Sequence, residues 1–189
     1  MKIGIVSDTH GSIDAWNRAL PFFDGADLII HAGDVLYHPP RVGSVQGYDI
    51  PALVEALNSS KIPIVIAHGN CDSQVYEELL KMPVQAPYAL VEFQGVRIVA
   101  NHGHLLSRDA MLDLARRYKA DYFVFGHTHV PDLEPCGDVV LINPGSITIP
   151  KLEIDGRRVP TVGLVTDDGA RIVSIDDGSV IREVRAPNK

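Results

Sequence analysis

The chain has 189 residues, of which 46% are hydrophobic, and its formal net charge is −7 at neutral pH. This composition is typical of a folded globular protein, and the length suits a single domain over residues 1–189. The acidic charge argues against a broad nucleic-acid-binding surface, although bound metal ions can still attract a phosphate substrate. With no signal peptide, no apolar run of membrane-spanning length and only two cysteines, we expect a cytoplasmic protein.

Short apolar runs alternate with helical patterns in the first half of the chain. The length and composition of these runs predict strands over residues 2–7, 27–31 and 63–67. Ser12 is placed to cap a first helix, and Pro51 suits the first turn of a second. We expect a third helix over 73–80, with Asp72 as its cap. Residues 37–50, rich in Pro and Gly, are either a plain surface loop or a wall of a substrate site.

In the second half, strand patterns follow one another closely. The runs 88–93 and 96–100 flank Gln94-Gly95, a two-residue hairpin signal, and Ser107 is placed to cap one more helix. Further strands are predicted over 121–125, 139–142, 162–166, 170–175 and 180–184. This order predicts an α/β fold, or α+β in some schemes, in which a two-sheet β-sandwich of mixed strands is flanked by helices.

Polar side chains with metal-binding chemistry recur where the predicted strands end. The segments are Asp8-Thr9-His10, Gly33-Asp34, Gly69-Asn70-Cys71-Asp72, His102-Gly103-His104 and Gly126-His127-Thr128-His129. Because loops at the carboxyl ends of strands meet at one rim of such a fold, we expect these side chains to converge. The candidate metal ligands are Asp8, His10, Asp34, Asn70, His102, His127 and His129. This mixture of carboxylate, imidazole and amide ligands suits Mn²⁺, Fe²⁺ or Zn²⁺. Seven ligands are too many for one ion and suit two ions that share a carboxylate.

Several of these residues have an ordinary structural interpretation when each is considered alone. A single aspartate such as Asp8 often caps a turn, and only the complete set favours ligation. We interpret His31 and His68 as core histidines, and Asp72 as a helix cap rather than a ligand. The segment Asn143-Pro144-Gly145-Ser146 is first a turn and only second a wall of the site.

With its five motifs in this order, the chain resembles the calcineurin-like metallophosphoesterase superfamily, whose blocks run D-x-H, G-D, G-N-x-D/E, G-H and G-H-x-H. In particular it is similar to the small bacterial and archaeal phosphodiesterases of the YfcE type. That likeness rests also on His38 and Arg41 after Gly33-Asp34-Val35-Leu36, and on Asn143-Pro144-Gly145-Ser146. It extends from about residue 1 to about residue 151.

The resemblance implies a binuclear metal-dependent phosphodiesterase that hydrolyses small phosphodiesters by in-line attack of a metal-bound hydroxide. It would place a first ion on Asp8, His10, Asp34 and His129, and a second on Asp34, Asn70, His102 and His127. The resemblance implies two divalent ions, with Mn²⁺ as the first choice and Fe, Zn or Ni as alternatives. The expected partner is a small phosphodiester, with no membrane and no extended nucleic-acid surface, and the resemblance is compatible with a homo-oligomer.

The group that protonates the leaving alcohol is not fixed by the motifs. Many members of the superfamily have histidine after the G-N pair, where this chain has Cys71, a poor substitute for an imidazole acid. His104 or a bound water is the alternative donor. Arg41 is a candidate for contacting a phosphate oxygen, or else packs in its loop. The catalytic candidates are therefore His104, Cys71 and Arg41.

Two other functions stay open beside the phosphodiesterase. A eukaryotic retromer subunit resembles this family but has a degraded metal site and works through protein contacts, so a non-catalytic scaffold is one alternative. The complete set of ligand types in this chain argues against it. A phosphomonoesterase or a nuclease on the same site is the other, although the chain lacks a basic groove for long nucleic acids.

Overall fold

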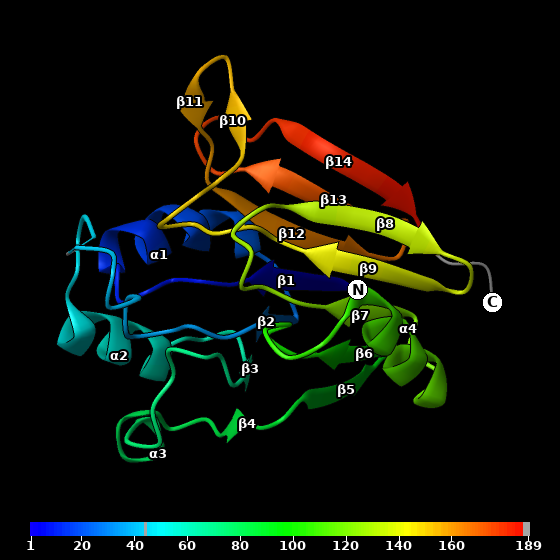
Figure 1. Ribbon diagram of the computed structural model, residues 1–189, viewed down its shortest axis with the longest axis horizontal. Helices are drawn as coiled ribbons and strands as arrows, with labels where there is room; N and C mark the ends of the chain where they lie inside the picture. The colour runs from blue at the N-terminus through cyan, green and yellow to red at the C-terminus, as the bar shows by residue number, and fades with distance from the viewer. Residues whose placement is uncertain (44, 187–189) are drawn as a thin grey trace.

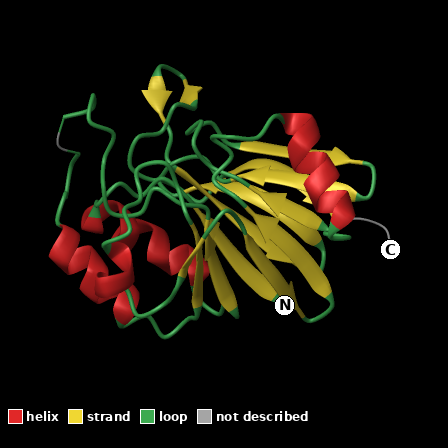
Figure 2. Ribbon diagram, turned by 60° about the horizontal axis from the view of Figure 1, so that its bottom comes forward, coloured by secondary structure: helices red, strands yellow, loops and turns green. Residues whose placement is uncertain are grey.

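The computed structural model describes residues 1–43 and 45–186. Two β-sheets pack face to face, and helices lie on the outer sides of the sandwich (Figure 1, Figure 2). The first sheet has the strand order β14-β13-β12-β1-β2-β3-β4, and the second has the order β5-β6-β7-β9-β8. Parallel and antiparallel pairs occur in both sheets, which confirms the predicted sandwich of mixed strands.

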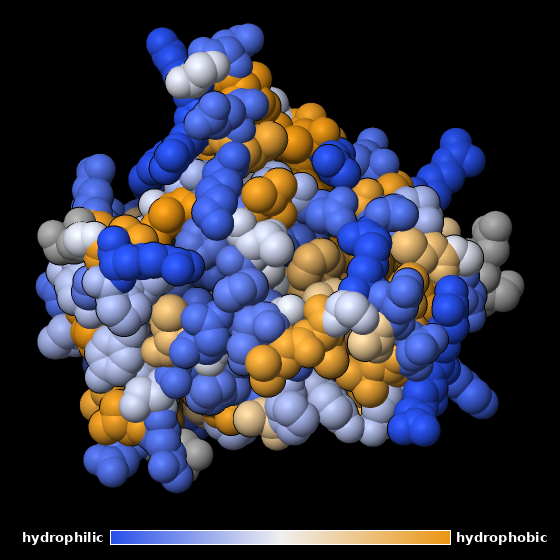
Figure 3. Space-filling model, viewed as in Figure 1, coloured by the Kyte–Doolittle hydropathy of each residue, from blue (hydrophilic) through white to orange (hydrophobic). Residues whose placement is uncertain are grey.

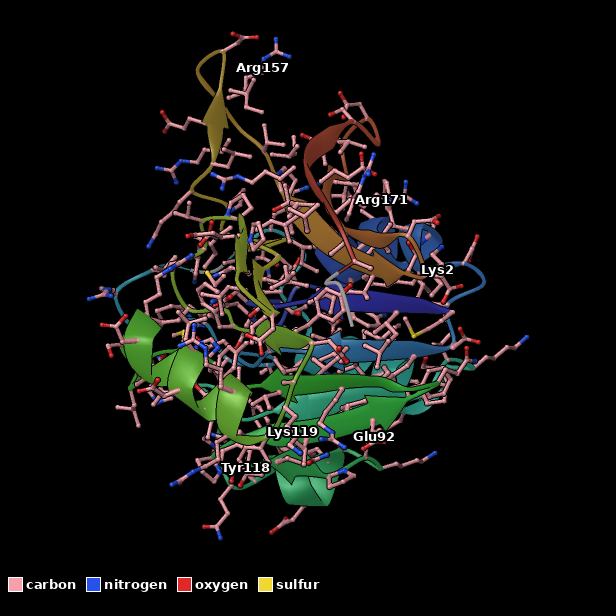
Figure 4. All side chains as sticks on the ribbon, turned by 90° about the vertical axis from the view of Figure 1, so that its right-hand side faces the viewer. Lys2, Glu92, Tyr118, Lys119, Arg157 and Arg171 are labelled. Atoms are coloured by element: carbon pink, nitrogen blue, oxygen red, sulfur yellow. The ribbon has the colours of Figure 1, made fainter. Side chains whose placement is uncertain are left out.

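The strands are short, as is usual in compact domains. Those of the first sheet are Lys2–Val6 (β1), Leu28–His31 (β2), Ile64–Ala67 (β3), Val84–Gln85 (β4), Thr161–Thr166 (β12), Gly169–Ser174 (β13) and Val180–Arg185 (β14). Those of the second are Ala89–Phe93 (β5), Val96–Ala100 (β6), Tyr122–Val124 (β7), Asp132–Cys136 (β8) and Val139–Asn143 (β9). A separate hairpin pairs Glu153–Ile154 (β10) with Arg157–Arg158 (β11), and Arg157 lies at its outer end (Figure 4).

Three hydrophobic layers hold the sheets and helices together. The helical elements are Ile13–Ala19 (α1), the 3-10 turn Leu20–Phe23 (η1), Ile50–Asn58 (α2), Tyr76–Leu79 (α3) and Arg108–Arg117 (α4). Side chains of β1 alternate, so that Ile3 and Ile5 pack between the sheets while Val6 packs against α1 and α2. On the other outer face, Met111 of α4 packs on Phe123 of β7.

The predicted caps Ser12 and Ser107 and the predicted hairpin are present. The Ser12 side chain accepts a hydrogen bond from the Ala15 N–H at the start of α1, and Ser107 does the same at the start of α4. Strands β5 and β6 pair antiparallel, and both residues of their turn have positive φ, 48° at Gln94 and 77° at Gly95. Positive φ at both positions matches the right-handed twist of the strands it joins.

The helix predicted over 73–80 is wrong in length, and so is the cap assigned to it. Helix α3 covers only Tyr76–Leu79 and has no side-chain cap. Asp72 is occupied elsewhere, because its buried carboxylate accepts hydrogen bonds from backbone N–H groups of two neighbouring loops. The prediction also missed β4, β8 and the β10–β11 hairpin. Strand β8 contains Pro135, which is tolerated because β8 lies at the edge of its sheet.

Within residues 1–43 and 45–186, the structure contains no helix with the length and apolar character needed to span a bilayer.

Candidate metal centre

The loops that leave β1, β2, β6 and β7 meet at one edge of the sandwich, where both sheets contribute side chains. Hydrophilic side chains gather in the middle of the face shown in Figure 3, beside a small hydrophobic group. The Asp8 carboxylate oxygen Oδ1 lies 3.2 Å from His129 Nε2, 3.7 Å from His10 Nε2 and 3.9 Å from His102 Nε2. Asp34 Oδ2 lies 3.3 Å from His102 Nε2 and 3.9 Å from His10 Nε2. The five side chains thus form one tight group.

Backbone carbonyl oxygens fix the three imidazoles of this group in one tautomer. The Nδ1 atoms of His10, His102 and His129 each lie 2.8 Å from a carbonyl oxygen, those of Tyr37, Ala32 and Ile149 respectively. A carbonyl oxygen can only accept a hydrogen bond, so each Nδ1 must carry a proton. In its neutral form each ring then presents an Nε2 lone pair towards the carboxylates. This is the usual way in which a protein orients histidine metal ligands.

The group is short of positive charge and of hydrogen-bond donors, which makes it suitable for a cation. His10 Nε2 and His129 Nε2 are only 3.3 Å apart, and both face the Asp8 carboxylate. Asp8 Oδ1 and His102 Nε2 are buried without a hydrogen-bond partner among the described residues. Unpaired buried polar atoms are costly, and a divalent cation would satisfy all of these lone pairs together. The donor set of carboxylate and imidazole therefore fits a borderline divalent ion.

The backbone of the candidate ligands is strained. Residues with a positive φ other than glycine are uncommon, yet this conformation occurs at Asp8 (56°), His10 (46°), Asp34 (58°), His127 (67°) and His129 (60°). Each such residue costs about 1–3 kcal/mol and persists only where the surrounding structure enforces it. Strain of this kind gathers at functional sites, and here it coincides with the strand ends that the sequence singled out.

Two glycines of the motifs allow the two carboxylates to approach neighbouring loops closely. A Cβ atom at Gly69 would lie 2.2 Å from Asp34 Oδ1, and one at Gly126 would lie 2.8 Å from Asp8 Oδ2. Contacts this short are essentially absent for real Cβ atoms, so a side chain at Gly69 would push on Asp34, and one at Gly126 would push on Ser7 and Asp8. Gly69 and Gly126 are therefore needed because these positions leave no room for a Cβ atom.

Two of the predicted ligands, Asn70 and His127, lie at the exposed side of the group rather than within it. The His127 ring centroid is 5.3 Å from that of His102. The Asn70 amide donates to Cys71 Sγ at 3.3 Å. The Cys71 backbone N–H in turn donates to Asp34 Oδ1 at 2.8 Å, which ties this loop to the bridging candidate.

Electrostatics differ among the ligand candidates. Burial opposes the ionised forms of Asp8 and Asp34, but the neighbouring imidazoles outweigh it and lower the pKa of both carboxyls. Burial lowers the pKa of His10. His102 behaves differently, because the adjacent Asp34 carboxylate, together with Asp8, overcomes burial and raises its pKa to about 9. The pKa of His102 is thus shifted in the direction opposite to that of His10.

The three catalytic candidates occupy different surroundings. The His104 ring is half-buried, with its centroid 5.5 Å from that of His102 and 6.0 Å from that of His127. Cys71 Sγ lies close to His10 and Asp34, and burial together with Asp34 raises its pKa to about 12, so it stays a thiol. Arg41 is exposed on its loop and makes no hydrogen bond or ion pair with any described residue.

The segment 143–146, predicted first as a turn and second as a wall of the site, supports the centre through hydrogen bonds. The Asn143 amide donates to Gly126 O and Thr128 Oγ1, and the Ser146 hydroxyl donates to Asp8 O. The 143–146 turn therefore braces two ligand loops. His31 is a core histidine, as predicted, with both ring nitrogens in hydrogen bonds. A buried Asn or Ser in a turn gives no sequence signal of this role, because such residues are also common in plain turns.

Comparison with known proteins agrees with this geometry. Residues 1–167 match the model of the calcineurin-like phosphoesterase superfamily domain. The phosphodiesterase YfcE of Escherichia coli (strain K12) is 36% identical over 186 residues, which cover 97% of each chain. A solved structure of Yfce, a phosphoesterase from E. coli, matches with a TM-score of 0.85 and 35% identity over 100% of both chains.

A more distant structure shares the fold alone. Vps29 from Entamoeba histolytica, solved in complex with Zn²⁺, matches with a TM-score of 0.61 and 19% identity over 98% of this chain and 99% of that one. The family match over most of the chain, and the close relative over nearly all of it, decide the assignment. This chain belongs to the calcineurin-like phosphoesterase superfamily.

Proposed function

We propose that the chain is a single catalytic domain that hydrolyses small phosphodiesters with two divalent metal ions, Mn²⁺ in the first place. The observation that carries this proposal is the convergence of Asp8, Asp34 and three oriented imidazoles, in which buried polar atoms have no hydrogen-bond partner among the described residues. The 36% identity to a phosphodiesterase over 97% of the chain supports a diester rather than a monoester as substrate.

The ligand assignment is the one that the family resemblance implies, and the positions of the two carboxylates support it. The first ion would be held by Asp8, His10, Asp34 and His129, and the second by Asp34, Asn70, His102 and His127. Bound divalent ions supply positive charge to phosphoryl oxygens and make water more acidic. Placing Asp34 in both sets is supported by its position, since Oδ2 faces His10 on one side and His102 on the other.

The remaining task for the chain is to deliver a proton to the leaving alcohol. His104 is the group we propose for this step, because it lies beside His102 and His127 at the accessible side and its buried Nδ1 has no partner among the described residues. Cys71 is a weak acid in this position, with its pKa raised to about 12 by burial and by Asp34. Arg41 would reach a phosphate only through its exposed loop.

Hydrolysis, rather than metal content, is the discriminating measurement. Bound metal alone does not separate an enzyme from a non-catalytic scaffold, because a protein can hold an ion without hydrolysing a phosphodiester. Chelator-treated protein should be inactive on a chromogenic phosphodiester and should recover activity when Mn²⁺ is added, with less recovery on the matching monoester. Full activity after chelation, or no recovery with Mn²⁺, Fe²⁺, Zn²⁺ or Ni²⁺, would contradict the proposal.

A further inference from the structure

The segment of residues 34–37, which follows β2, is held in an unusual way. All four of its consecutive backbone N–H groups donate to just two side chains. Those of residues 34 and 35 donate to the two carboxylate oxygens of Asp72, at 2.9 and 2.8 Å. Those of residues 36 and 37 donate to the hydroxyl oxygen of Tyr76, at 3.2 and 2.9 Å. All of these acceptors are side-chain oxygens and none is a backbone carbonyl, so the segment depends on Asp72 and Tyr76 for its conformation.

The same segment presents its carbonyl oxygens to the loop that carries His10. The Asp34 carbonyl accepts from the His10 N–H at 3.0 Å, and the next carbonyl accepts from the Gly11 N–H at 2.9 Å. The Tyr37 carbonyl accepts from His10 Nδ1 at 2.8 Å, and this bond fixes the tautomer of that ring. A shift of the segment would therefore turn His10 as well as Asp34.

Asp72 also ties in the loop that follows β3. Its Oδ2 accepts a third hydrogen bond from the Gly69 N–H at 2.7 Å. In that loop the Cys71 N–H donates to Asp34 Oδ1, which leaves Asp34 Oδ2 free to face His10 and His102. The two oxygens of the Asp34 carboxylate thus differ in role. Oδ1 accepts the hydrogen bond that fixes the carboxylate, and Oδ2 faces the imidazoles of the centre.

Both side chains are anchored in the interior. Tyr76 is 1% exposed and belongs to the core between the first sheet and its helices. Its ring packs at a tilt of 55° against the ring of Tyr37, with the two ring centroids 5.4 Å apart. Asp72 is 9% exposed, and its carboxylate is satisfied by backbone N–H groups rather than by a lysine or arginine. Groups locked by packing in this way can impose a precise geometry on the atoms they hold.

We propose that Asp72 and Tyr76 form a clamp that positions Asp34 and His10 for metal binding. The inference rests on the proposed function, in which Asp34 bridges the two ions. Neither clamp residue touches the metal; both act through the backbone of residues 34–37. Loss of the clamp should therefore weaken both sites, because the bridging carboxylate belongs to both.

The sharpest test removes one oxygen atom. Tyr76→Phe deletes the acceptor of two N–H groups and keeps the ring that packs in the core. Tyr88→Phe is the matched control, because the Tyr88 hydroxyl pairs with that of Tyr118, which lies at the end of α4 (Figure 4). Thermal unfolding of the chelator-treated proteins reports stability, and calorimetric titration with Mn²⁺ reports affinity independently of activity.

We expect both variants to lower the unfolding temperature, but only Tyr76→Phe to weaken Mn²⁺ binding, by about 10-fold or more, as is usual when a group behind a metal ligand is lost. Equal Mn²⁺ affinity in the two variants would overturn the clamp, since a purely structural hydroxyl would give that result. Wild-type protein that binds none of Mn²⁺, Fe²⁺, Zn²⁺ and Ni²⁺ would overturn the proposed function and the clamp with it.

A second pair of variants keeps the test decisive if Tyr76→Phe is unstable. Asp72→Asn must turn an NH₂ group towards a backbone N–H, because both carboxylate oxygens accept in the wild type. Its control is Asp121→Asn, where the carboxylate, just before β7, accepts from the Arg97 N–H of β6. Weaker Mn²⁺ binding in Asp72→Asn alone supports the clamp, and unchanged binding in both contradicts it.

Discussion

Single side chains at the centre are oriented by the backbone, and their conformations carry a measurable cost. His10, His102 and His129 donate from Nδ1 to carbonyl oxygens, so their Nε2 atoms point at the carboxylates. The cost is visible in the positive φ of the five residues at the strand ends. Both features follow from tertiary contacts, which is why the motifs alone could identify the residue types but could not predict the tautomers or the strain.

The strain can be tested at His127, which is exposed and has a φ of 67°. His127→Gly and His127→Ala both remove the imidazole and differ only in the Cβ atom. A Cβ in the left-handed region costs about 1–2 kcal/mol, so the glycine variant of the metal-free protein should be the more stable of the two. Chemical denaturation measures the difference.

Thr128, the next residue, provides the matched control because its φ is not positive. There Ala should be more stable than Gly, in the ordinary order. The same order at both positions would show that residue 127 is not strained.

Metal binding should release a proton from His102. Its pKa in the metal-free protein is raised to about 9, so below that pH a proton must leave Nε2 before the atom can bind a cation. Affinity for Mn²⁺ should therefore rise between pH 7 and pH 9, by up to about 10-fold per pH unit. Calorimetry in buffers of different ionisation enthalpy counts the protons released, and an affinity independent of pH over this range would be inconsistent with the assignment.

The same proton stabilises the metal-free protein. A raised pKa gives stability that is complete below the ordinary histidine pKa of about 6.5 and disappears as pH rises towards 9. Chelator-treated protein should therefore unfold at a lower temperature at pH 9 than at pH 6.5, and added Mn²⁺ should remove this difference.

Cys71 limits the chemistry of the leaving group. Because its thiol is a weak acid, with a pKa of about 12, Cys71 cannot assist His104, the donor proposed above, and diesters with acidic phenol leaving groups should react faster than alkyl diesters. A positioned general acid is worth about 10²–10⁴-fold, so Cys71→His should accelerate the poor leaving groups most. Rates for diesters of graded leaving-group pKa measure this, with Cys71→Ala as control. If Cys71→His and the wild type show the same flat dependence, another group already supplies the proton, and His104→Ala becomes the next variant.

Among the secondary-structure elements, strongly patterned segments were predictable and segments fixed by contacts were not. Local sequence was enough to predict the parallel strands β1, β2 and β3 and the parallel strands β6, β7 and β9. It also predicted the caps Ser12 and Ser107 and the β5–β6 turn. Helix α3 is shorter than its pattern suggests because Asp72 serves the neighbouring loops. Strand β8 could not be predicted because it contains Pro135, which argues against a strand. The proline is tolerated because β8 lies at the edge of its sheet, and this position is known only from the structure.

A cap on an outer helix should affect stability but not the centre. Ser107→Ala leaves the Ala110 N–H at the start of α4 without its acceptor and should cost about 1 kcal/mol of unfolding free energy. Since α4 packs on the outer face of the second sheet, Mn²⁺ affinity should stay at the wild-type value. A marked loss of affinity in this variant would mean that α4 contributes to the geometry of the centre.

The molecule as a whole places its candidate metal centre where the two sheets meet. Asp8, His10 and Asp34 come from loops of the first sheet, whereas His102 and His129 come from loops of the second. An ion held by both sets would therefore join the two halves of the sandwich. Because a ligand that binds only the folded state stabilises it, each site filled by Mn²⁺ at about 100 times its Kd should add about 2.7 kcal/mol to the unfolding free energy.

The most direct test of the shared centre is the number of Mn²⁺ ions bound by Asp34→Asn, compared with the wild type and with His129→Ala. The amide oxygen of the new side chain can still accept from the Cys71 N–H, so the loop is preserved while the charge next to His10 and His102 is lost. Two ions per chain are expected in the wild type, about one in His129→Ala, and a loss from both sites together with hydrolysis in Asp34→Asn. An Asp34→Asn protein that keeps two ions and its activity would contradict the account.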